Sequence, residues 1–138
     1  MKNLRSALVA FTVLLMATAA HAQQTRVKAT VPFNFVAGDR AYPAGDYLFS
    51  NNGTILQVTN TEDAASTEML LSRPCEKSSP SEKTVVVFHQ MGGNYFLQQI
   101  WVAGQAHGRE LPTSKSEIRL AQNHEKPESV IVAANIAK

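Results

Sequence analysis

The longest stretch of regularly spaced apolar residues covers residues 84–103, where two β-branched and aromatic runs flank Gly92-Gly93. Glycines reach the positive φ angles that a tight hairpin turn requires, so the pattern predicts two antiparallel strands joined at this pair. In that register Phe88 faces Leu97. Both faces of the paired strands are apolar, which indicates a hairpin covered on both sides.

The alternation also divides the hairpin's side chains between the two faces. We expect one face to carry Val86, Phe88, Tyr95, Leu97 and Trp101, and the other to carry Val85, Val87, Phe96, Ile100 and Val102.

Residues 26–35 alternate between apolar and polar side chains, with apolar positions recurring from Val27 to Phe35. A period of two predicts a strand with one buried face and one solvated face. Pro32 has no amide hydrogen to give to a sheet, so we expect this strand to lie at an edge or to be interrupted there.

A second hairpin is predicted over residues 46–60 and is centred on Asn52-Gly53, a pair that favours a type I′ turn. This register pairs Phe49 with Leu56. A further strand is expected over residues 66–72, and residues 73–83, which contain two prolines and several serines, are expected to form a loop.

After residue 103 the alternating pattern of the strands ends. Ser114 and Glu117 have the spacing of a capping box, which predicts a helix over residues 115–123. Residues 129–134 are short and β-branched, so we expect a final strand there. Taken together, the pattern predicts a mainly β protein of six or seven short strands with one C-terminal-region helix, arranged as an antiparallel β-sandwich or a partly open barrel.

The first residues have the pattern of a targeting signal. Lys2 and Arg5 precede an apolar run, and Ala20-His21-Ala22 follows the small-x-small cleavage rule. We therefore expect residues 1–22 to be a secretory signal peptide and residues 23–138 to be a single β-rich domain, exported to the periplasm or secreted. The apolar run is shorter than the roughly 20 residues that span a bilayer, so no stable membrane anchor is predicted.

The net charge bears on the class of partner, and the cysteine content bears on how the fold is stabilised. Without Lys2 and Arg5, 11 of the 13 basic residues remain against 11 acidic ones. A near-zero net charge without a basic cluster argues against nucleic acid as a partner. Cys75 is the only cysteine, so the chain has no internal disulfide and depends on its core.

Several short motifs also occur together: Val31-Pro32-Phe33-Asn34-Phe35, Pro43-Ala44-Gly45-Asp46-Tyr47 and Gly108-Arg109-Glu110-Leu111-Pro112. With them the chain resembles a group of small exported bacterial proteins of unknown function, over nearly all of residues 23–138. The resemblance implies a signal peptide and a compact β-rich domain. It implies no activity, cofactor or site residue.

Candidate chemistry is sparse. The sequence has no Gly-x-Ser-x-Gly motif, phosphate loop, dinucleotide fingerprint or calcium loop, and His89, His107, His124 and Cys75 lack the close spacing of metal ligands. We therefore predict no catalytic residue, cofactor or metal. Arg73 and Lys77 near Cys75 leave open a reactive thiol, because cations lower a thiol pKa, but an unpaired loop cysteine is the preferred interpretation.

Three residues are candidates for a ligand pocket. Tyr95 and Trp101 lie at strand spacing, where aromatics are either core or the lining of a barrel cavity. Arg109 lies between a glycine-rich break and the predicted helix, where it forms either a local ion pair or a cation at a pocket mouth.

Three hypotheses about function follow. The first is a non-catalytic exported β-domain with a binding or structural role in the cell envelope, whose partner is an unknown envelope or extracellular protein or a small ligand. The second is a carrier of a small apolar ligand in a pocket lined by aromatics. The third is an enzyme whose site is not visible in the sequence.

Overall fold

The computed structural model of the protein describes residues 24–123 and 125–137, and this part contains eleven strands and one helix. The predicted signal peptide, residues 1–22, lies outside the described residues. The strands in chain order are β1 (Arg26–Val31), β2 (Phe35–Ala37), β3 (Arg40–Tyr42), β4 (Gly45–Asn52), β5 (Ile55–Asn60), β6 (Thr67–Leu71), β7 (Arg73–Glu76), β8 (Val85–Met91), β9 (Asn94–Trp101), β10 (His107–Glu110) and β11 (Glu128–Ala137), and the helix α2 is Lys115–Gln122.

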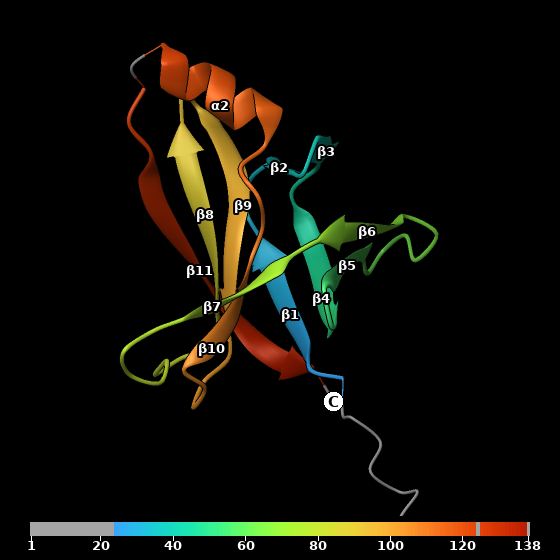
Figure 1. Ribbon diagram of the computed structural model, residues 1–138. Coiled ribbons are helices and arrows are strands. Elements are labelled where there is room, and N and C mark those ends of the chain that lie inside the picture. Colours follow the sequence, from blue (N-terminus) through green and yellow to red (C-terminus); the bar gives the residue numbers. More distant parts are fainter. Residues whose placement is uncertain (1–23, 124, 138) are drawn as a thin grey trace, which may run out of the picture.

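Nine strands form one strongly curled sheet in the order β3-β2-β9-β8-β11-β1-β4-β5-β6 (Figure 1). Its pairings are antiparallel except that between β2 and β9, which is parallel, so the sheet is mixed. The sheet curls into a half-barrel whose inner face is apolar. The expectation of a mainly β fold with one helix in the C-terminal region is confirmed.

Two further strands connect the distant parts of the curl. β7 continues from β6 after a single residue, Ser72, and pairs with β10, which in turn pairs with β9. The sheet pairings therefore run from β9 to β6, the chain itself passes from β6 into β7, and the pairings of β7 with β10 and of β10 with β9 lead back to β9. These strands enclose one end of the curl, and α2 lies across the ends of β8 and β9 at the other (Figure 1).

The helix begins where the capping box predicts. Ser114 has extended backbone angles, and its hydroxyl accepts a hydrogen bond from the Glu117 amide at 3.1 Å. The helix ends at Gln122 with Asn123 as its C-cap, one residue before the predicted end. Among the described residues, no helix is both long and apolar enough to cross a bilayer.

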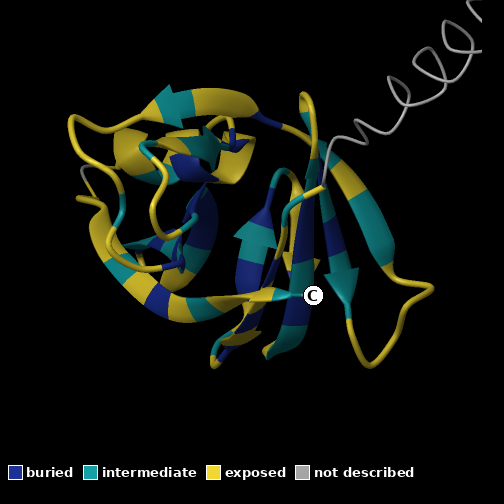
Figure 2. Cartoon of the chain, turned by 90° about the horizontal axis from the view of Figure 1, so that it is seen from below, coloured by how far each residue is buried: buried dark blue, intermediate teal, exposed yellow. Residues whose placement is uncertain are grey.

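The core lies on the inner face of the curled sheet, where buried positions alternate with exposed ones along the strands (Figure 2). β1 shows the alternation most clearly, because every second residue from Val27 to Val31 is buried. Toward the α2 end the core is aromatic. Phe33, Phe35, Tyr42, Tyr47, Phe88 and Tyr95 are in ring contact there, with neighbouring centroids 3.8–5.9 Å apart.

The predicted number of strands is wrong. The strand expected over residues 26–35 is interrupted after Val31, which gives β1 and β2, and β1 is paired on both sides instead of lying at an edge. β3 is an additional short strand. Residues 73–76, expected in a loop, form β7, and residues 107–110, which begin inside the glycine-rich break expected over residues 104–108, form β10. These two strands have no alternating apolar residues, so only their pairing reveals them.

Both predicted hairpins form, each with a correction. The Gly92-Gly93 turn and the pairing of Phe88 with Leu97 are confirmed. Gln98, however, forms a β-bulge: Val87 pairs with Gln99, and the side chains beyond the bulge exchange faces. Ile100 therefore faces the core with Val86, and Trp101 lies on the other face with Val85.

In the second hairpin, Phe49 pairs with Val58 instead of Leu56, and the turn residues are Gly53 and Thr54. A shift of two residues keeps the same side chains on the inner face, because side chains alternate with period two. Phe49, Leu56 and Val58 are accordingly all buried.

Candidate functional site

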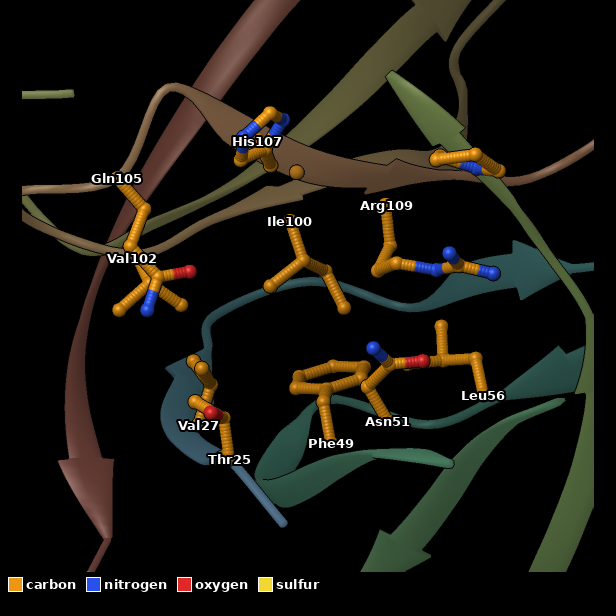
Figure 3. A pocket seen from close by; sticks show the side chains of 12 residues that line it. Thr25, Val27, Phe49, Asn51, Leu56, Ile100, Val102, Gln105, His107 and Arg109 are labelled. Atoms are coloured by element: carbon orange, nitrogen blue, oxygen red, sulfur yellow. The ribbon is translucent and has the colours of Figure 1, made fainter. Parts of the chain in front are cut away.

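A cavity of about 220 Å³ lies inside the curled sheet, at the end enclosed by β7 and β10 (Figure 3). One side of the cavity is built by β1, β4 and β5, and the other by the end of β9 and by β10. Other hollows of about 400, 620 and 370 Å³ lie on the surface. Their linings consist mostly of exposed residues, whereas this cavity reaches the core.

The wall of the cavity is apolar. Val27, Phe49, Leu56 and Ile100 all line it, and each is at most 6 % exposed. Ile100 extends from β9 toward Phe49 in the close view (Figure 3). Ile100 reaches this position because of the bulge at Gln98, since the regular register would direct its side chain to the outer face.

Arg109 provides the positive charge of the cavity. Its Nε donates to the Ser72 hydroxyl at 3.1 Å, and its Nη2 donates to the Ser72 carbonyl and hydroxyl, both at 2.8 Å. Ser72 is itself buried and its amide donates to the Thr54 carbonyl at 2.8 Å. The guanidinium is therefore held in one orientation by three hydrogen bonds to a single residue.

Asn51 provides an unpaired acceptor. It extends from β4 on the side of the cavity opposite Arg109 (Figure 3). Its Oδ1 is buried and accepts no hydrogen bond from any described residue. A buried carbonyl without a donor costs about 1–3 kcal/mol of stability.

The structure places the three predicted pocket residues in different surroundings. Arg109 lines the cavity, and neither Tyr95 nor Trp101 does. Tyr95 stacks on Phe33 in the aromatic cluster, with ring centroids 3.8 Å apart. Trp101 is buried on the outer face of the sheet, where the Lys77 ammonium lies 4.0 Å from its ring centroid.

Gly108 fits closely against Trp101. A Cβ at this position would lie 2.7 Å from both the Ile100 carbonyl oxygen and the Trp101 ring. This close approach lets β10 pair with β9 directly beside the indole. It thereby fixes the position of the next residue, Arg109, at the cavity.

Cys75 lies on β7, paired with Gly108, and is half-buried. Burial raises the pKa of its thiol, the Glu110 carboxylate raises it further, and Arg109 and Lys77 lower it by less. The cations near Cys75 in the sequence therefore do not activate it. The thiol stays protonated near neutral pH, which disfavours a nucleophilic role.

Two imidazole–carboxylate pairs are present in the described part of the chain. His89 Nδ1 lies 3.1 Å from Glu117 Oε1, and His107 Nδ1 lies 3.1 Å from Glu76 Oε1. His89 pairs with Phe96 across the hairpin, and its contact with Glu117 connects α2 to β8. Neither pair has a hydroxyl or thiol hydrogen-bonded to its imidazole among the described residues, so the geometry lacks the nucleophile of a hydrolytic triad.

A metal site is not formed in the part of the chain that the structure describes, where no three His, Cys, Asp or Glu side chains converge. His124 lies outside the described residues. Sequence reasoning missed Asn51 and Leu56 as cavity residues and Ser72 as the residue that holds Arg109. A signal for Leu56 was present in the inner face of the second hairpin, but Asn51 resembled part of a turn and Ser72 the end of a strand.

No protein-family model, curated protein or solved structure matches this chain.

Proposed function

We propose that this protein is an exported, non-catalytic β-domain that binds a small, mainly apolar molecule in the cavity between β1, β4, β5 and β9. Export is inferred from the signal-like residues 1–22, which support a site of action in the cell envelope or outside the cell. The proposal combines the first two sequence hypotheses. It also relocates the pocket from Tyr95 and Trp101 to the residues around Phe49 and Ile100.

The observation that carries this proposal is a mainly apolar cavity that reaches four core residues, Val27, Phe49, Leu56 and Ile100. Ligand sites are concave, mostly apolar and fitted with a few polar groups, and this cavity has that composition. A cavity of about 150 Å³ accepts benzene, so about 220 Å³ encloses about nine non-hydrogen atoms. Transfer of each methylene from water contributes about 0.8 kcal/mol to binding.

An enzymatic function receives less support. The buried Glu117 carboxylate is engaged by His89 and by Gln98, whose amide donates to both of its oxygens at 2.7 and 2.8 Å. These contacts satisfy the carboxylate and anchor the helix. They leave it no free role as a general base.

The proposal is tested by titrating the isotope-labelled protein with octan-1-ol, a neutral eight-carbon probe, and following its amide NMR signals. We expect saturable shifts at Val27, Phe49, Leu56 and Ile100. The variant Val102→Phe places a ring at the cavity and is expected to weaken binding about tenfold or more.

The matched control is Ala103→Phe, which adds the same ring at an exposed neighbouring position that does not line the cavity. This variant should bind octan-1-ol like the parent protein. Absence of saturable shifts at the cavity residues, or equal weakening by both variants, would contradict the proposal.

A further inference from the structure

We propose that the free edge of β6 binds an extended, uncharged peptide segment of a partner protein, which adds to the sheet as a further strand. β6 lies at one end of the nine-strand order, and β5 is its only strand neighbour among the described residues. None of the residues of β6, Thr67–Leu71, lines the cavity. The proposal therefore concerns a second site and does not depend on the proposed function.

The hydrogen-bond pattern shows which backbone groups of β6 are free. The Ser72 amide donates to the Thr54 carbonyl at 2.8 Å, on the side of β5. Backbone groups along a strand point alternately to its two sides, so every second residue counted back from Ser72 also bonds to β5. The residues between them point their N–H and C=O groups away from β5, and no hydrogen bond joins these groups to another described residue. They are Thr67, Met69 and Leu71.

The pairing of β7 with β10 stops just before it would cover this edge. In its register Arg73 pairs with Glu110, so Leu71 would be the next residue to bond across the pair, to Pro112. Pro112 has no amide hydrogen, and the chain beyond it leads to the N-cap of α2. A hollow of about 370 Å³ remains between the edge and residues 111–115. This hollow lies where the missing part of the ladder would be.

The chemistry of the edge indicates its occupant. A row of free backbone donors and acceptors selects an extended chain, because a strand offers the complementary groups at the same spacing. Met69 and Leu71 are 72 % and 68 % exposed, and directly opposite residues of paired strands share a face, so apolar residues fit opposite them. The charged residues that line the hollow are Asp39 and Lys115, one of each sign, which favours an uncharged segment.

The two ends of the sheet differ in their protection. Natural proteins protect edge strands with charged side chains and prolines. β3, at the opposite end of the order, begins with Arg40 and is followed by Pro43. β6 contains no proline, and its only charged residue, Glu68, is paired with Arg40. The packing of the described residues does not use the free edge of β6, whereas a partner strand would.

The test titrates the isotope-labelled protein with the peptide acetyl-Thr-Val-Thr-Val-Thr-amide and follows the amide NMR signals. We expect saturable shifts at Thr67, Met69 and Leu71. A peptide methylated at both valine nitrogens should bind at least about tenfold more weakly, because the residues opposite Met69 and Leu71 direct their N–H groups to β6. A peptide methylated at the central threonine nitrogen should bind within about threefold of the parent peptide, because that N–H points away from β6.

A variant of the protein removes the matching donor. Met69→Pro deletes a free N–H without breaking a bond of the sheet, because proline is tolerated where the N–H of an edge strand faces solvent. It should lower the affinity for the peptide about tenfold or more. The matched control Met69→Ala keeps the N–H and should lower the affinity by about threefold or less. If Met69→Pro fails to fold, the two methylated peptides still decide whether the β6 backbone binds the probe.

Three outcomes would overturn the proposal. The first is the absence of saturable shifts at β6, or an equal loss of affinity for the two methylated peptides. The second is a dimer in sedimentation velocity that Met69→Pro abolishes while the peptide does not bind, which would assign the edge to a second copy of this chain. The third is displacement of the peptide by octan-1-ol, which would assign the peptide to the cavity and leave the proposed function standing.

Discussion

Tyr42 and Tyr47 show how much one hydrogen bond changes the contribution of a buried side chain. Both are buried, and their rings pack edge-on with centroids 5.9 Å apart. The Tyr47 hydroxyl donates to the Pro43 carbonyl at 2.6 Å, whereas the Tyr42 hydroxyl is buried without a partner among the described residues. The hydroxyl therefore has a hydrogen-bond partner at position 47, whereas at position 42 its burial without a partner lowers the stability of the fold.

This difference predicts opposite responses to the same substitution. Tyr47→Phe should lower the free energy of unfolding by about 1 kcal/mol, because it removes a hydrogen bond and leaves the Pro43 carbonyl without it. Tyr42→Phe should leave the free energy unchanged or raise it by up to about 1 kcal/mol. Urea denaturation measures both, and equal losses in the two variants would contradict the assignment.

At the scale of single residues, sequence reasoning identified Arg109 but not its partner. An arginine after a glycine-rich break is visible in the sequence as a charge without an obvious role. Ser72 lies 37 positions earlier in the chain, and the two meet only because β7 pairs with β10. Contacts between strands so far apart have no local signature in the sequence.

The helix α2 is held to the sheet by one buried carboxylate. Glu117 is 4 % exposed and accepts hydrogen bonds from Gln98 on β9, while its Oε1 lies 3.1 Å from His89 on β8. In a capping box this side chain would instead return to the Ser114 amide. The bulge at Gln98 explains the change, because it directs the Gln98 amide to the carboxylate.

Glu117→Ala should therefore destabilise the protein by about 2–3 kcal/mol, since it leaves the Gln98 amide buried and unpaired. Ser116→Ala, at the preceding exposed position, is the control and should change the free energy of unfolding by less than about 0.5 kcal/mol. Thermal or urea unfolding gives both values. A loss in the control as large as that in Glu117→Ala would show that helix propensity, not the buried network, is responsible.

Among the elements, those with a periodic apolar pattern were predictable. The hairpin around Gly92-Gly93, the strand from Arg26 and the capped helix all follow from local sequence. The strands β7 and β10 were not predictable, because they contain a proline and a glycine and depend on long-range pairing. The bulge at Gln98 also left no signal, since Gln98-Gln99 fits a regular strand equally well.

The stability of the whole molecule should depend on pH in the alkaline range. Burial raises the pKa of both Tyr42 and Tyr47 above their ordinary value of 10.0. Each phenol holds its proton more tightly in the folded than in the unfolded protein. The resulting stabilisation is complete below pH 10 and is lost as the pH rises through the folded-state pKa values.

We therefore expect the free energy of unfolding to fall as the pH rises above about 10, with a smaller fall in a Tyr42→Phe, Tyr47→Phe double variant. Urea denaturation at about pH 8, 10 and 11 measures this difference. The double variant separates the tyrosines from lysines, which titrate in the same range. Identical slopes in the parent and the double variant would exclude this contribution of the two phenols.

The mainly β class of the fold could be predicted from the sequence, but the strand order that curls the sheet into a half-barrel could not. Alternation along each strand predicted a mainly β body whose apolar faces meet. The strand order could not be read from the sequence, because β11 enters the sheet between β1 and β8 and thereby pairs the last described strand with the first. The cavity is a product of this order, since its walls come from strands that are distant in sequence.

Ser72 couples the connection between β6 and β7 to the position of Arg109. It is the single residue between β6 and β7, it is tied to Thr54, and it holds the guanidinium of Arg109. Any movement of the chain where β6 passes into β7 would therefore also free the Arg109 guanidinium from its hydrogen bonds.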